Sequence, residues 1–156
     1  MKKVDLLMHA LDSTFDQESW FAPFKPSMEG ITAEQAKWKP EGEATKSIWE
    51  NASHLIYYKE RLTAKLEGRD WTQNLDGDET FHYVPQSDED EEWHQVVERA
   101  GKAHNQLREA LSQLTDDQLE KESLDEKLLD IFLHDAYHTG QIIQIRKLQG
   151  SWPANR

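Results

Sequence analysis

The fold of this chain is decided by the stretch Leu133-His134-Asp135-Ala136-Tyr137-His138-Thr139-Gly140-Gln141-Ile142. Two histidines stand four residues apart in it, and the apolar residues around them recur with the period of a helix. Residues four apart lie on the same face of a helix, with Cβ atoms about 5–6 Å apart. Such a pair can reach one metal ion, at about 2.0–2.1 Å from each ring nitrogen if the ion is zinc. The stretch therefore predicts a long helix with His134 and His138 on one face.

This helix is predicted to run from about residue 125 to Gln149, where Gly150 ends it. Its predicted core-facing seam consists of Ile131, His134, His138, Ile142, Ile145 and Leu148. A buried polar group needs a partner. Each histidine therefore either forms a hydrogen bond within the core or binds a metal ion.

A third histidine, His54, is the only histidine of the predicted second helix, and it completes a candidate three-nitrogen set with His134 and His138. Three protein ligands leave at least one coordination position for water or substrate, as in catalytic zinc sites. Neutral imidazoles also suit nickel, iron, cobalt and copper, so the ligand type does not select the metal. The set predicts a divalent ion that activates a bound water or thiol, or polarises a carbonyl.

Three further helices complete the predicted architecture. The first covers residues 3–20. The second begins at Ile48, with Ser47 as the N-cap of the capping box Ser47-Ile48-Trp49-Glu50, and ends near Gly68. The third carries an apolar seam at alternating spacings of four and three, formed by Trp93, Val97, Ala100, His104, Leu107, Leu111 and Leu114. Four long helices without a strand pattern predict an all-α four-helix bundle. We expect one domain over residues 1–156, with crossover connections after the first and second helices.

The connections carry shorter signals. Capping boxes at residues 32–35, 115–118 and 123–126 predict helix starts, and Trp71 and Phe81 are predicted to hold the loop of residues 68–86 against the bundle. Ser87 precedes the acid run Asp88-Glu89-Asp90-Glu91-Glu92. Carboxylates in a first helical turn complement the helix dipole, and a calcium or partner site is the alternative interpretation of this run.

Composition excludes several classes of protein. The 156 residues carry a net charge of −12, with 18 Lys and Arg residues scattered singly among 30 Asp and Glu residues. Such a surface repels nucleic acid and anionic membranes. The absence of cysteine excludes disulfides and thiolate ligands, and no apolar run reaches the roughly 20 residues of a membrane span. Asp5, His9 and Asp12 interrupt the segment where a signal peptide needs an apolar run, so we predict a cytoplasmic protein.

Some residues close to the predicted ligands admit two interpretations. Asp135 makes a motif similar to the His-Glu-x-x-His of zinc proteases, but that reading needs a glutamate and a further ligand downstream. A solvated acid, or a hydrogen-bond partner behind a ligand, is the favoured role for Asp135. Gln141 either lines the site or lies on the helix surface. Tyr57, Tyr58 and Tyr137 either contact substrate or pack.

The other histidines are weighed in the same way. His104 falls on the seam of the third helix and is either a hydrogen-bonded core residue or part of the pocket. His9, His82 and His94 have no such position and are predicted to lie at the surface. Glu91-x-x-His94 suggests a di-iron bundle, but that site needs two Glu-x-x-His helices and the chain has one.

Three segments span the framework of residues 1–149 and carry a resemblance to a known family. They are Gly30-Ile31-Thr32-Ala33-Glu34-Gln35-Ala36-Lys37-Trp38-Lys39-Pro40, then Ser47-Ile48 with Asn51-Ala52-Ser53-His54-Leu55, and the stretch from Leu133 to Ile142. In these segments the chain resembles the DinB-like (DinB/YfiT) superfamily. The resemblance implies an antiparallel bundle, often a homodimer, with zinc or nickel on His54, His134 and His138. It also implies kinship with S-transferases that use bacillithiol, mycothiol or glutathione, and with thiol-dependent maleylpyruvate isomerases.

These observations lead to one main functional hypothesis and two alternatives. In the first, a metal on the three histidines activates a thiol or water against a small electrophile, as in a thiol S-transferase. A metal-dependent hydrolase on the same site is the second. The third is a non-enzymatic metal-binding or stress-related protein, and a closed four-ligand site would favour it. The expected partner is a small-molecule substrate, including a low-molecular-weight thiol.

Overall fold

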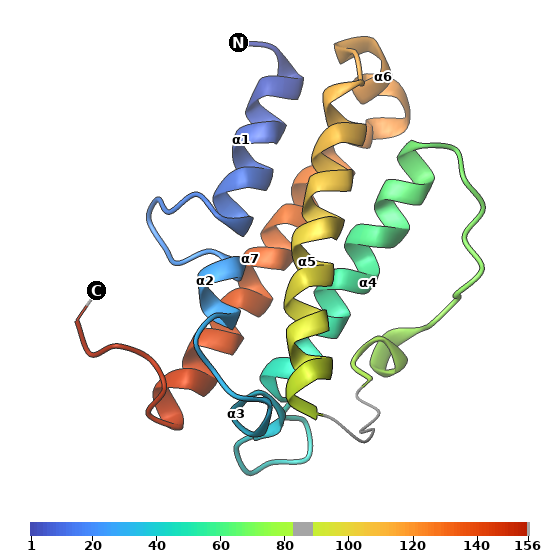
Figure 1. Cartoon of the computed structure of the whole chain (residues 1–156). Helices are drawn as coiled ribbons and strands as arrows, with labels where there is room; N and C mark the ends of the chain where they lie inside the picture. Colours follow the sequence, from blue (N-terminus) through green and yellow to red (C-terminus); the bar gives the residue numbers. More distant parts are fainter. Residues whose placement is uncertain (83–88, 156) are drawn as a thin grey trace.

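The computed structural model describes residues 1–82 and 89–155. Four long helices form its framework, namely α1 (Lys3–Phe15), α4 (Ile48–Leu66), α5 (Glu89–Ser112) and α7 (Leu124–Leu148). In Figure 1, α1 and α7 run downward, whereas the neighbouring helices α4 and α5 both run upward. The chain therefore crosses the length of the bundle between α4 and α5. The all-α four-helix-bundle fold predicted from the sequence is confirmed.

Short elements fill the connections. Helices α2 (Phe24–Met28) and α3 (Ala33–Lys37) lie between α1 and α4, and the 3-10 turn η1 (Gly77–Thr80) follows α4. Helix α6 (Asp116–Glu120) and the 3-10 turn η2 (Lys121–Ser123) join α5 to α7. The capping boxes at Thr32, Ser47 and Thr115 form as predicted, each hydroxyl accepting a bond from the backbone N–H three residues ahead.

One predicted helix boundary and one predicted cap are wrong. The first helix ends at Phe15 rather than residue 20, because the N–H groups of Asp16 and Gln17 both turn back to the carbonyl of Asp12. The capping box at Ser123 does not form, since Ser123 has a φ of 53° and its side chain caps no N–H group. The acid run begins α5 at Glu89, and its first residue lies outside the described residues, as does Ser87.

The core consists of two apolar clusters with a polar layer between them. The first cluster includes Phe15, Phe24, Ile48, Trp49, Leu55, Ala103 and Ile142. The second includes Leu7, Leu11, Leu62, Leu107, Leu128 and Phe132. On each long helix a buried polar residue falls between positions of the two clusters, and these residues are Asp12, Lys59, His104 and Asp135. Asp135 and Lys59 form an ion pair of 2.5 Å in which both side chains are at most 1 % exposed.

The buried face of α7 differs from the predicted seam. Leu148 is 58 % exposed, whereas Phe132, Asp135 and Thr139 are buried. Apolar residues occupy a wide arc of this helix, so their periodicity does not determine which face is buried. Asp135 and Thr139 are polar, so the sequence gives no indication that their side of the helix faces the core. The helix is rotated so that His138 is buried beside the core and His134 is half-buried at its margin.

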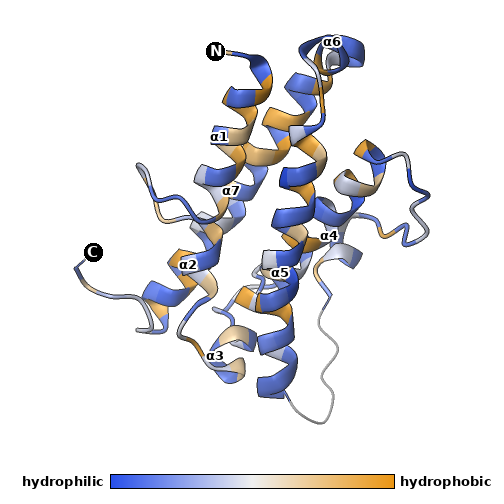
Figure 2. Ribbon diagram, turned by 45° about the horizontal axis from the view of Figure 1, so that its top comes forward, coloured by the Kyte–Doolittle hydropathy of each residue, from blue (hydrophilic) through white to orange (hydrophobic). Residues whose placement is uncertain are grey.

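The outward-facing side of α5 is polar. Figure 2 shows mostly hydrophilic residues on the side of α5 that faces the viewer, with hydrophobic residues on the flanks that meet other helices. None of the described helices combines the length and the hydropathy needed to cross a membrane.

Candidate metal centre

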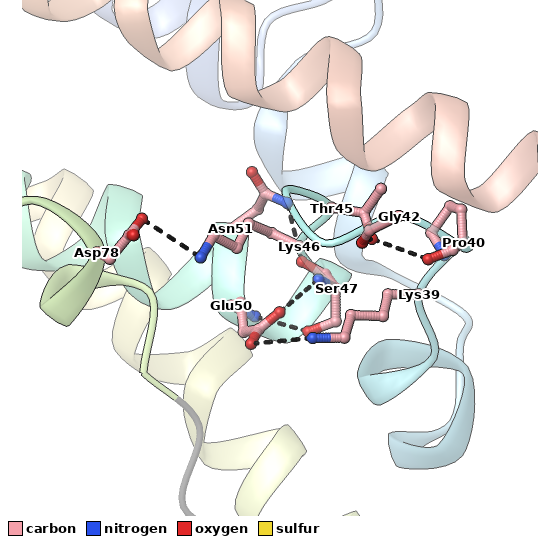
Figure 3. Close-up of polar contacts among 9 residues, drawn as sticks. All are labelled: Lys39, Pro40, Gly42, Thr45, Lys46, Ser47, Glu50, Asn51 and Asp78. Atoms are coloured by element: carbon pink, nitrogen blue, oxygen red, sulfur yellow. Dashed lines mark hydrogen bonds and ion pairs between the residues drawn. The ribbon is translucent and has the colours of Figure 1, made fainter.

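The first turn of α4 is fixed by its cap. The Oγ of Ser47 accepts a hydrogen bond from the N–H of Glu50 at 3.0 Å, and the carboxylate of Glu50 accepts from the N–H of Ser47 at 2.6 Å (Figure 3). The Asn51 side-chain amide donates to the carbonyl of Ser47 at 2.9 Å. These bonds hold Asn51 in place one helical turn before His54, so both side chains lie on the same face of α4.

The structure brings His54 of α4 together with His134 and His138 of α7. One nitrogen of each ring lies within 4.8 Å of the others, and the Nε2 atoms of His54 and His134 are 3.0 Å apart. His54 and His138 are 6 % and 7 % exposed, and His134 is half-buried. The three histidines predicted as a set therefore form one buried group, and this group fits a metal-binding protein.

Hydrogen bonds fix which nitrogen of His54 and of His138 carries the proton. The Thr80 hydroxyl donates to the carbonyl of Gly77, so at 2.6 Å from His54 it accepts a bond from the Nδ1–H. The amide nitrogen of Asn51 donates to the carbonyl of Ser47, which leaves the Asn51 Oδ1 pointing to His138. This oxygen accepts a hydrogen bond from the Nδ1–H of His138 at 3.0 Å. Both rings consequently present an unprotonated Nε2. Partners of this kind orient metal-binding histidines in known metal sites.

The electrostatics of the group suit a cation. Burial, and then the proximity of His138 and His134, lowers the pKa of His54 to about 3. Burial and the nearby His134 lower the pKa of His138 to about 4, and burial also lowers the pKa of His134. All three rings are thus neutral at pH 7, the state that metal binding requires. Two nitrogens bound to one tetrahedral zinc ion are about 3.3 Å apart, close to the spacing of the His54 and His134 Nε2 atoms.

Replacing Asn51 by leucine is expected to weaken zinc binding by about 10–100-fold, because the Nδ1–H of His138 loses its acceptor. Thr80→Val removes the acceptor of His54 while keeping the side-chain shape, and the same effect is expected. Competition with a chromogenic chelator measures both affinities. Asn74→Ala, at an exposed asparagine, serves as the control. Wild-type affinity in both variants would show that these bonds do not orient the ligands.

An aromatic residue from the loop covers the centre. The ring of Phe81 stacks on His54 with centroids 3.9 Å apart and planes at 8°. Lys46 lies over the Phe81 ring at 5.1 Å and forms an ion pair with Asp78 of η1 at 3.4 Å (Figure 3). The predicted role of Phe81 in holding the loop is confirmed, and its position also shields one side of His54 from water.

The three tyrosines near the ligands have different positions. Tyr57 packs, with its hydroxyl donating to the carbonyl of Gln73 at 2.7 Å and accepting from the N–H of Leu75 at 3.0 Å. The Tyr58 ring meets His54 edge-on at 5.0 Å and His134 at 5.7 Å. Tyr137 meets the ring of His138 at 5.1 Å and is 65 % exposed. Tyr58 and Tyr137 therefore border the centre, whereas Tyr57 supports the loop.

The structure settles the role of Asp135. Its side chain is fully buried and is paired with Lys59, so the predictions of a solvated acid and of a hydrogen-bond partner behind a ligand are both wrong. The pairing also removes the protease interpretation, because a carboxylate held by a buried ammonium is not available as a general base. Gln141 is exposed, and its side chain acts against the lowering of the His138 pKa, so it lies beside this ring at the margin of the centre.

Two cavities lie on the seam between α4 and α7, one on each side of the three histidines. A cavity of about 320 Å³ includes Gln141 and also Asn51, which bonds to His138. A cavity of about 760 Å³ includes Tyr58, which contacts two of the histidine rings, and Ile131, one turn before His134. Ligand sites usually have volumes of about 300–1,000 Å³, so either cavity is large enough for a small molecule beside the centre.

His104 lies in the core, away from the three histidines. It is 2 % exposed, stacks on Phe15 with centroids 4.0 Å apart, and has its Nε2 3.5 Å from Asp12. Asp16 completes a second group of possible metal ligands with these two residues. Arg108 donates to both oxygens of Asp12 at 3.0 and 3.2 Å. A guanidinium thus already occupies the place of a cation. His104 is a core residue as predicted, but its buried Nδ1 has no hydrogen-bond partner among the described residues.

The metal-free protein is expected to lose stability as the pH falls below about 6.5, partly through His104. Burial, with a contribution from the Lys59 charge, lowers the pKa of His104 to about 4. The charges of Asp16 and Asp12 act in the opposite direction and only partly offset this lowering. As the pH falls, His104 is therefore protonated in the unfolded chain before it is protonated in the folded protein. The free energy of unfolding is highest above the pKa of the unfolded state and decreases on acidification. The loss through this one group is about 2 kcal/mol between pH 7 and pH 5.

Urea unfolding of wild type and His104→Gln at both pH values measures this contribution. The variant is expected to lose less stability than wild type over that interval. An equal loss in the two proteins would show that His104 is not one of the groups responsible.

The remaining histidines take no part in the centre. His9, His82 and His94 are exposed as predicted. His94 faces Glu98 at 3.3 Å rather than a metal group, and Glu91 is exposed. The di-iron interpretation is therefore wrong.

The sequence did not predict two residues that bond to the histidines of the group. Asn51 stands one helical turn before His54, and this spacing is a signal that it shares the ligand's face. Thr80 comes from a 3-10 turn 26 residues beyond His54, and nothing in the local sequence indicates the contact.

Comparison with protein families agrees with this geometry. Residues 22–142 match the model of the DinB superfamily, and the matched segment contains all three histidines together with Asn51 and Thr80. No curated protein and no solved structure matches the chain. Since the family match covers most of the 156 residues, the chain belongs to the DinB superfamily.

Proposed function

We propose that this protein is a metal-dependent enzyme whose ion, zinc or nickel, is held by His54, His134 and His138. The supporting observation is the convergence of three neutral imidazoles, two of which are fixed with Nε2 unprotonated. Among the residues that the structure describes, no carboxylate or fourth histidine joins the group. Three ligands of this kind characterise open, catalytic sites.

A divalent ion bound there supplies Lewis acidity, which lowers the pKa of a bound thiol or water at neutral pH. The chain's own residues orient the ligands and limit access. Asn51 and Thr80 hold two rings, and Phe81 covers one side of His54. Tyr58 and Tyr137 border the centre. We propose that a low-molecular-weight thiol attacks a small electrophile at this position, as in an S-transferase. The thiol sulfur bonds to the electrophilic carbon, the leaving group (chloride in the probe below) departs with its electron pair, and the thiol proton passes to solvent.

The test combines elemental analysis with turnover. Tag-free protein is loaded with zinc or nickel and assayed with 1-chloro-2,4-dinitrobenzene in the presence of glutathione, bacillithiol or mycothiol, beside 4-nitrophenyl acetate without thiol. We expect about one ion per chain and thiol-dependent turnover, both lost in His138→Ala and both kept in His94→Ala.

Two outcomes would overturn the S-transferase proposal. Ester hydrolysis without thiol, lost in His138→Ala, would indicate the hydrolase instead. Retained metal without turnover of either substrate would indicate a non-enzymatic metal-binding protein.

We also propose a homodimer, in agreement with the family resemblance. An exposed apolar stripe on α7 supports it, formed by Leu129, Leu133 and Tyr137, which are 45–65 % exposed at successive helical turns. Light scattering after size exclusion measures the state. Leu133→Glu is expected to shift a dimer to a monomer, and a monomeric wild type would refute the proposal.

A further inference from the structure

The larger cavity on the α4–α7 seam gathers positive charge in a strongly acidic protein. Its lining includes four basic residues, Arg61, Lys65, Arg69 and Lys127, against one acidic residue, Asp130. The whole chain carries 30 acidic and 18 basic residues. The basic residues stand apart in the sequence, but the fold collects four of them around one cavity of about 760 Å³. We refer to this cavity as the basic pocket.

Three of these cations are available to a ligand. Arg61, Lys65 and Lys127 are exposed and form no ion pair within residues 1–82 and 89–155. Arg69 pairs with Glu67 at 2.5 Å. An adjoining cavity of about 240 Å³ shares Lys65 and Lys127 and adds Lys121, against one acidic residue, Glu122. The positive potential therefore extends beyond the pocket, which favours the approach of an anion.

The wall opposite α7 is rigid. Gly68 takes a φ of +67° after α4, and the N–H of Arg69 bonds back to the carbonyl of Ala64 at 2.8 Å, which is a Schellman ending. The Trp71 indole donates to the carbonyl of Gln73 at 2.7 Å and packs edge-on against Tyr57. The loop thus presents a fixed aromatic surface to the pocket.

The rest of the lining is apolar. Leu62, Leu124 and Ile131 form the floor between the two helices, and Trp71 and Tyr58 supply aromatic surface. A pocket with basic residues at its rim and an apolar, aromatic interior is complementary to a small molecule that has an anionic head and an apolar body.

We propose that the basic pocket binds small organic anions, with the carboxylate or phosphate held by Arg61, Lys65 and Lys127 and the apolar body lying between Trp71 and Ile131. Tyr58 separates this position from the rings of His54 and His134. A ligand longer than the pocket reaches the three histidines by passing Tyr58. That last placement rests on the proposed function, whereas anion binding in the pocket does not.

Nuclear magnetic resonance titration tests the proposal on metal-free and zinc-loaded protein. The probes are phenylsuccinate, its uncharged diamide and phenyl phosphate, and the reporter is the Trp71 indole N–H, assigned with Trp71→Phe. We expect the two anions to shift this signal and the amides of residues 61–71 and 124–131. The diamide is expected to bind about tenfold more weakly. The anion with the higher affinity identifies the head group.

Matched charge variants provide the control. Arg61→Gln/Lys65→Gln/Lys127→Gln is expected to weaken anion binding about tenfold. Lys25→Gln/Lys102→Gln/Lys147→Gln changes the net charge equally at exposed lysines outside the pocket and is expected to leave binding unchanged. Equal binding of phenylsuccinate and its diamide to wild type, or equal weakening in both triple variants, would overturn the proposal. Since binding is expected without metal, a protein that lacks turnover can still pass this test, and the two proposals fail separately.

Discussion

Replacing Lys59 by methionine is expected to lower the free energy of unfolding by about 3–5 kcal/mol. The ammonium of Lys59 lies 2.5 Å from Asp135, and both groups are shielded from water. Methionine fills the space of the lysine stem but leaves the carboxylate of Asp135 without its cation. A buried, unpaired charge is among the most destabilising features of a protein interior. Urea unfolding of the metal-free protein at pH 7 measures the change.

The double variant Lys59→Met/Asp135→Val separates the lost charge pair from lost packing. It removes both charges and is expected to recover most of the stability, because buried pairs replaced by apolar residues are often neutral. Lys65→Met, at an exposed lysine of the same helix, is expected to change stability by less than about 0.5 kcal/mol. If the double variant is as unstable as Lys59→Met, the loss comes from packing and not from the unpaired carboxylate.

Zinc is expected to stabilise the folded protein strongly, because the complete site exists only when α4 and α7 are packed together. An ion at about 1,000 times its Kd adds about 4 kcal/mol. For a chain of this length that corresponds to a rise of about 8–16 °C in Tm. Thermal unfolding followed by circular dichroism, with zinc and with excess chelator, measures the difference.

Histidine variants show whether the stabilisation comes from the proposed site. His134→Ala is expected to abolish the rise in Tm, and it is the safest ligand to remove because its side chain is half-buried rather than buried. His94→Ala is expected to keep the full rise. A rise that survives in His134→Ala would place the zinc elsewhere, for example at Asp12, Asp16 and His104.

The sequence was sufficient to predict the four long helices and the group of three histidines. Capping boxes at Thr32, Ser47 and Thr115 mark real helix starts, because an N-cap depends on residues only three positions apart. The histidine pair at i and i+4 was informative for the same reason. His54 was found without knowledge of the fold, since it is the only histidine on its helix.

The orientation of α7 and the surroundings of the three histidines could not be predicted. Asp135 and Thr139 lie in the core, where periodicity arguments expect apolar residues. The partners of Asp135 and His54, namely Lys59 and Thr80, come from other elements, and only the folded chain brings them within bonding distance. The basic pocket could not be predicted for a similar reason. Its basic residues are separated along the sequence, and only the fold brings them around one cavity.

The ion pair of Lys59 and Asp135 also determines how α4 and α7 are aligned along their axes. Sliding one helix past the other by one turn, about 5.4 Å, would separate the ammonium of Lys59 from the carboxylate of Asp135 and leave both buried charges unpaired. Only one alignment therefore satisfies both groups. Asp135 is the residue next to His134, and Lys59 follows His54 by five positions, so the alignment that joins the charges also brings the three imidazoles to the same height. Two helices with only apolar contacts could shift along each other at a small cost in free energy. In this protein the buried ion pair fixes the axial position of α4 relative to α7 directly beside the histidines.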